Sequence, residues 1–198
     1  MTDRPAQGDG GSAGAPAPTA ASRRPAGAVR AWLVVLGWVW ALTLVASLAT
    51  ATITPLAHAT RELLELRLVA ATNPPPSLGR VVAIAAHNIQ TAGWPLLLPV
   101  LGAQRRAWSR TLADAAVIAG VVVNALLVGA ALGSYQARLL PYLPQLPLEW
   151  GAVAIAPAQW WLSRRGNDGG SNRWSAAATL VLTLAAAALV ETFCVPHR

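Results

Sequence analysis

The sequence is poor in charge, in cysteine and in lysine. Only 12% of its 198 residues are charged, whereas about one quarter of the residues of a soluble domain are charged, so an ordinary soluble domain is excluded. Cys194 is the single cysteine, which excludes an internal disulfide. Because there is no lysine, all 15 basic residues are arginines, and their positions along the chain become informative.

What the chain has instead is a series of apolar segments. A helix needs about 20 apolar residues to cross a hydrocarbon core of about 30 Å. We therefore predict an all-α, polytopic membrane helix bundle with about five transmembrane helices. The predicted spans are residues 32–53, 81–101, 112–133, 148–162 and 175–195. Residues 1–29, rich in Gly, Pro, Ala and Ser, are predicted to be a disordered cytoplasmic tail, and residues 30–198 the transmembrane domain.

Prolines mark the two least regular spans. Pro95 and Pro99 should kink the second span. The fourth span is short for the bilayer and contains Pro157. It either begins earlier, near Leu143, or enters the membrane as a partly re-entrant segment.

Residues 56–71 show a different pattern, with apolar residues on one helical face and charges on the other. The apolar face holds Leu56, Ala59, Leu63, Leu66 and Ala70, and the charged face holds Arg61, Glu62 and Glu65. This pattern predicts an amphipathic helix that lies on the membrane or caps the bundle.

The arginines predict the orientation. Cytoplasmic loops carry an excess of basic residues. Ten arginines fall on one side of the predicted spans: Arg4, Arg23, Arg24, Arg30, Arg105, Arg106, Arg110, Arg164, Arg165 and Arg173. The other side has Arg61, Arg67, Arg80, Arg138 and Arg198. We therefore expect a bacterial inner-membrane protein with a cytoplasmic N-terminus, an extracytoplasmic C-terminus and an extracytoplasmic amphipathic helix.

Polar residues inside the spans converge on the outer half of the bundle. They are His87, Asn88, Asn124, Glu149 and Glu191, from four different helices. Polar groups at this depth are costly, so each needs a role. They could form a hydrogen-bonded network that fixes the bundle, or a proton or ion path through Glu149, Glu191 and His87. Alternatively, Glu149 follows Pro147 and could simply occupy the favourable first turn of a helix.

Two further features concern helix packing and helix ends. Gly129 and Gly133 have the GxxxG spacing that permits close approach of two helices. Asp114 is expected in the first turn of the third span.

The sequence lacks the common catalytic and metal-binding motifs. No paired ligands have metalloprotease spacing, and there is no phosphate loop or nucleophile elbow. We therefore predict no metal site, no cofactor and no enzymatic activity.

Four short segments resemble the stage II sporulation protein M family of bacterial integral membrane proteins. They are residues 188–196 with Glu191, the pair His87-Asn88, Asn124 with Gly129 and Gly133, and residues 146–150 with Glu149. The last corresponds to a Pro-His-Gly-x-x-Glu stretch of the family, whose His-Gly this chain lacks. The resemblance implies a membrane scaffold, with Asn88, Asn124, Glu149 and Glu191 as parts of its structural core. Members that act in sporulation help to organise cell-wall-degrading proteins.

These observations lead to two functional expectations. The first is a non-enzymatic membrane scaffold that organises partner proteins at the cell envelope, including cell-wall remodelling factors. The alternative is a transporter or permease component that uses the outer polar cluster. The expected partners are the lipid bilayer and membrane or envelope proteins, and a homo-oligomer is compatible with the sequence. Nucleic acid is excluded, because the arginines lie in loops and the tail rather than on one folded face.

Overall fold

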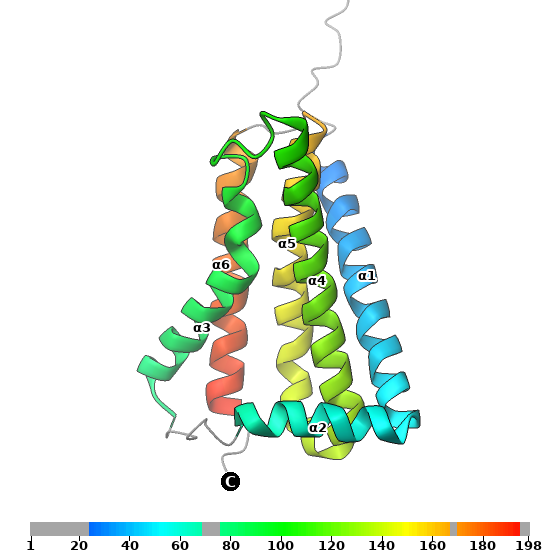
Figure 1. Ribbon diagram of the computed structural model, residues 1–198. Helices are drawn as coiled ribbons and strands as arrows, with labels where there is room; N and C mark the ends of the chain where they lie inside the picture. The colour runs from blue at the N-terminus through cyan, green and yellow to red at the C-terminus, as the bar shows by residue number, and fades with distance from the viewer. Residues whose placement is uncertain (1–23, 69–75, 167–169, 195–198) are drawn as a thin grey trace, which may run out of the picture.

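The computed structural model describes residues 24–68, 76–166 and 170–194, with no strand among them. This part of the chain confirms the all-α prediction (Figure 1). The α-helices are α1 (Arg24–Thr52), α2 (Thr54–Leu68), α3 (Leu78–Gly93), α4 (Ala107–Tyr135), α5 (Leu146–Arg164) and α6 (Gly170–Cys194). Two 3-10 helices, η2 (Trp94–Leu97) and η3 (Gln136–Gln145), follow α3 and α4.

Three helical segments are long and apolar enough to cross a membrane: Ala26–Thr52, Ala107–Leu139 and Arg173–Cys194. Their outward faces remain apolar, since Leu48 in α1, Ile118 in α4 and Leu182 in α6 are all exposed. A water-soluble protein of this size would not expose such continuous apolar surface. The fold is thus that expected of a membrane-embedded bundle.

α5 is the central helix of the bundle. α1 packs along both α4 and α5, and α6 packs along both α5 and α3. α5 is consequently enclosed on several sides, and Ala152, Ala154 and Ala156 have no exposed surface. The small alanine side chains allow the neighbouring helices to approach from different directions. α2 differs from the others because it lies across one end of the bundle (Figure 1).

The GxxxG prediction is confirmed as a helix contact. A Cβ added at Gly129 would overlap the backbone carbonyl oxygen of Thr43, and one at Gly133 would overlap that of Ser47. α1 presents small residues at this contact, and the Thr43 hydroxyl is satisfied by the Val39 carbonyl of its own turn at 2.8 Å. α4 and α1 are therefore packed backbone to backbone along this seam.

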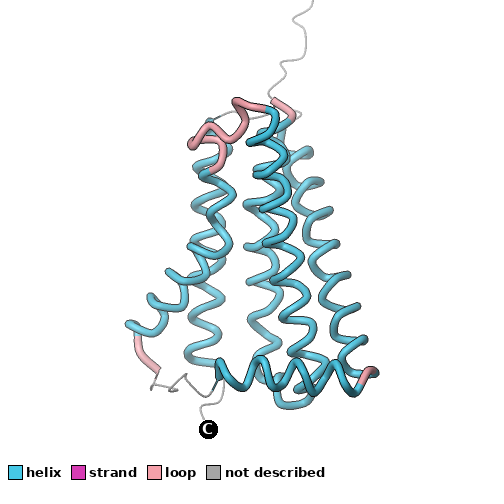
Figure 2. The backbone as a smooth tube through the Cα atoms, in the orientation of Figure 1, coloured by secondary structure: helices cyan, strands magenta, loops and turns pink. Residues whose placement is uncertain are grey.

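Several predicted boundaries were wrong. α1 begins at Arg24, so the last six residues of the predicted disordered tail are helical, and Pro25 falls in the first turn, where a proline is tolerated. The α-helix of the second predicted span ends at Gly93 instead of kinking and continuing to residue 101. Pro95 lacks the N–H that the α-helix needs, so the 3-10 helix η2 follows, and beyond it the chain enters a loop, drawn in pink in Figure 2.

The fourth and the amphipathic helices also have different bounds. α5 begins at Leu146, two residues before the predicted span, and it continues through Pro157 to Arg164. α2 begins at Thr54 rather than at residue 56. Residues 69–71 of the predicted amphipathic helix lie outside the described residues, as do residues 1–23 of the predicted tail.

Candidate functional site

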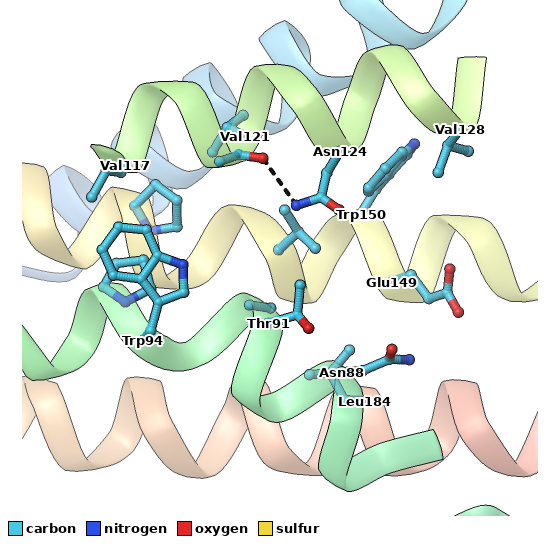
Figure 3. Close-up of a pocket in the computed structure, with 15 residues that line it drawn as sticks. Asn88, Thr91, Trp94, Val117, Val121, Asn124, Val128, Glu149, Trp150 and Leu184 are labelled. Atoms are coloured by element: carbon cyan, nitrogen blue, oxygen red, sulfur yellow. Dashed lines mark hydrogen bonds between the residues drawn. The ribbon is translucent and has the colours of Figure 1, made fainter. Parts of the chain in front are cut away.

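A cavity of about 200 Å³ lies between α3, η2, α4 and α5. Its polar lining comes from Asn88 and Thr91 on α3, Asn124 on α4 and Glu149 on α5 (Figure 3). Trp94 and Trp150 add two indole rings, and the remaining lining is mostly aliphatic. This combination of apolar walls and a few converging polar groups is typical of small-molecule sites, although the volume is below the usual range of about 300–1,000 Å³.

Three predicted site residues therefore meet at one cavity, each on a different helix. Glu149 lies in the first turn of α5, immediately after the Pro147 that opens the helix. This position places the carboxylate at the positive end of the helix dipole. Asn124 donates its side-chain N–H to the Gly120 carbonyl of its own helix at 2.9 Å, so that donor does not bridge two helices. Its amide oxygen remains available to the cavity.

His87 and Glu191 do not line this cavity. His87 is exposed, because adjacent residues of an α-helix point in directions about 100° apart and Asn88 faces inward. Glu191 lies in α6, close enough to Glu149 for their charges to interact, and Arg80 is close enough to Glu191 to act on it. The polar cluster is thus divided into a part that lines the cavity and an acidic side chain, Glu191, that lies outside the lining.

One lining group has a buried donor without an acceptor. Trp150 is only 3% exposed, and its indole N–H has no hydrogen-bond partner among the described residues. Its ring packs in a core cluster with Val39, Ala125 and Leu146. An orphaned donor at this depth costs about 1–3 kcal/mol unless a bound molecule accepts it.

A group of side-chain hydrogen bonds and an ion pair at the opposite end of the bundle was not predicted from the sequence. Asp114 lies well past the first turn of α4, which begins at Ala107, so the first-turn expectation was wrong. Asp114 accepts the Trp160 indole N–H at 2.9 Å and forms an ion pair with Arg164. Nearby, Gln104 donates to the Ser163 hydroxyl at 2.7 Å. The sequence does place all of these hydrogen-bonding and charged residues near the arginine-rich ends of the predicted spans, and that position was the available indication that they could interact.

The chemistry of the described residues is sparse. Residues 24–68, 76–166 and 170–194 bring together no group of three His, Cys, Asp or Glu side chains that could hold a metal ion. No protein-family model, curated protein or solved structure matches this chain.

Proposed function

We propose that this protein is a non-enzymatic integral membrane scaffold with five spans, which organises partner proteins at the bacterial cell envelope. The resemblance to the stage II sporulation protein M family favours this function. The five-span proposal is supported by α3 and α5, which run beside the three candidate spans (Figure 1). α1, α3, α4, α5 and α6 run alternately in opposite directions along the bundle (Figure 1), which favours termini on opposite sides of the membrane, and the arginine excess favours the cytoplasm for the N-terminus.

The observation on which the scaffold proposal depends is the placement of α2. Ala57 is buried, and the Arg61 guanidinium donates to the Ser134 carbonyl of α4 at 3.0 Å, so α2 is fixed to the bundle. Leu56 and Leu63 nevertheless remain 42% and 53% exposed. α2 is thus attached to the bundle at the proposed extracytoplasmic end, with apolar side chains exposed to an envelope partner.

Photo-crosslinking in intact cells tests this proposal. A photoreactive amino acid at Leu63 should give a discrete protein adduct, whereas the same group at the lipid-facing Leu182 should not. Mass spectrometry should identify the protein that is crosslinked at Leu63 as an envelope protein, such as a cell-wall remodelling factor. If Leu63 gives only the products that Leu182 gives, docking through α2 is rejected.

A transporter or permease component is the second candidate, and the polar cavity favours it. Transport requires that the cavity open to water. A cysteine at Asn88, introduced together with Cys194→Ser, should react with a membrane-impermeant thiol reagent added outside the cell if the cavity opens there. Protection of that cysteine in folded protein would reject transport through this cavity.

A further inference from the structure

A basic pocket of about 390 Å³ lies between α1 and α5, at the end of the bundle where α1 begins and α5 ends (Figure 1). Arg30 of α1 and Arg165, which directly follows α5, line it together with Trp161. The Arg165 guanidinium lies over the Trp161 indole, 4.5 Å from the ring centroid. This contact holds the guanidinium at the pocket but gives its N–H donors no acceptor oxygen.

An apolar groove of about 530 Å³ continues from the basic pocket along α1, α4 and α5. The pocket and the groove share the Trp161 indole. On α1 the lining passes from Val34 in the pocket to Trp38 and Leu42 in the groove, and this spacing keeps all three on one helical face. At a rise of 1.5 Å per residue, Leu42 lies about 18 Å further along α1 than Arg30. Pocket and groove are thus consecutive parts of one surface feature, basic at the end of the bundle and apolar below it.

The positive charge of the pocket has no counter-charge in residues 24–68, 76–166 and 170–194. Neither Arg30 nor Arg165 forms a side-chain hydrogen bond or an ion pair with another residue of these ranges. Asp114 borders the groove, but its carboxylate already accepts the Trp160 indole N–H and pairs with Arg164. Two guanidinium groups therefore remain to bind an external anion, and phosphate oxygens match their donor geometry.

The groove faces the surroundings of the bundle. Trp38 on α1 and Ile118 on α4 line it and are both exposed. In a bilayer this surface meets acyl chains, whereas Arg30 and Arg165 lie at the level where a headgroup ends those chains. The occupant that matches both parts is therefore an amphiphile with an anionic head and an apolar tail.

We propose that the basic pocket and the apolar groove bind one anionic phospholipid of the cytoplasmic leaflet. Arg30 and Arg165 bind its phosphate, and an acyl chain lies in the groove against Trp38 and Ile118. Basic pockets between membrane helices on the cytoplasmic side are typical sites for anionic headgroups. A zwitterionic lipid fits less well, because its ammonium group would face two guanidinium groups. Binding requires neither a protein partner nor transport, and in detergent it is independent of the proposed topology.

Native mass spectrometry of the full chain in detergent tests the proposal, with phosphatidylglycerol and phosphatidylethanolamine of the same acyl chains titrated separately. The first phosphatidylglycerol should bind saturably and at least about tenfold more tightly than phosphatidylethanolamine. Glycerol phosphate, which supplies the anion without acyl chains, should bind at least about tenfold more weakly than phosphatidylglycerol. Equal affinity for the two lipids, or for phosphatidylglycerol and glycerol phosphate, would overturn the proposal.

Arginine variants locate the headgroup. The double substitution Arg30→Gln and Arg165→Gln should weaken phosphatidylglycerol binding at least about tenfold. Arg105→Gln with Arg106→Gln is the matched control, because it removes two exposed arginines that line neither the pocket nor the groove. An equal loss in both double variants would show that net charge alone attracts the lipid and would reject this site. If the first variant does not fold, the comparison of the two lipids on the unmodified chain still decides the proposal.

A bulky substitution in the groove tests the place of the acyl chain. Ile118→Trp narrows the groove and should weaken phosphatidylglycerol binding several-fold, while the arginines remain. Leu182→Trp places the same side chain on the exposed face of α6, outside the groove, and should leave the affinity unchanged. Unchanged affinity in folded Ile118→Trp protein would reject the groove as the acyl-chain site.

Discussion

Gly129 of α4 lies directly against the backbone carbonyl of Thr43 in α1. A methyl group at Gly129 would meet that oxygen and also the Ala46 methyl group, whose carbon would lie at 2.8 Å. No flexible side chain can move aside, because the obstacle is backbone. The most extensive helix contact among the described residues thus requires that Gly129 carry no Cβ atom.

Gly129→Ala should therefore destabilise the protein by about 1–3 kcal/mol, the usual cost of overpacking. Gly37→Ala is the matched control, since a Cβ there meets nothing within 4 Å. That change should leave stability unchanged or slightly higher, because alanine is the better helix former. Thermal unfolding in detergent measures both variants. Equal melting temperatures would show that α1 and α4 are not tightly packed.

The Asp114–Arg164 pair should couple α4 to α5. Both side chains are about one third exposed, so we expect a coupling free energy of only about 0.5–1 kcal/mol. A double-mutant cycle with Asp114→Asn and Arg164→Gln, followed by thermal unfolding, gives this value. Raising the salt concentration should reduce the coupling. Additive effects of the two substitutions would contradict the ion pair.

The Trp32 side chain ties α1 to α5, because its indole N–H donates to the Gly151 carbonyl at 2.8 Å. Trp32→Phe removes this donor while keeping most of the ring. The expected loss of stability is about 1 kcal/mol. Trp38→Phe is the control, since Trp38 is 65% exposed on the same helix. A comparable loss in both variants would point to ring packing rather than to the hydrogen bond.

The proposed topology is tested with reporter fusions. Alkaline phosphatase, which is active only outside the cytoplasm, should be active when fused after residue 198 and inactive when inserted in the turn at residues 104–106. The physical reason is that arginines are retained on the cytoplasmic side. A cytosolic C-terminus would reject the five-span arrangement and place α2 on the opposite face of the membrane.

Much of the architecture follows from local chemistry. Apolar runs of sufficient length predict membrane helices, the helical spacing of apolar and charged residues predicts α2, and Pro147 with Glu149 predicts the start of a helix. The spacing of Gly129 and Gly133 predicts a close contact. None of these inferences needs the partner helix to be known, because each rests on backbone preference, on solvation or, for the two glycines, on the lack of a side chain.

The pairing of helices is different, because it depends on which faces meet in space. Asn88 lines the cavity while the adjacent His87 is exposed, a distinction that only the rotation of α3 against its neighbours provides. The same is true of Trp150, whose unpaired N–H is invisible until the surrounding helices are placed. Side-chain chemistry identifies the polar groups, but the three-dimensional packing selects those that share a cavity.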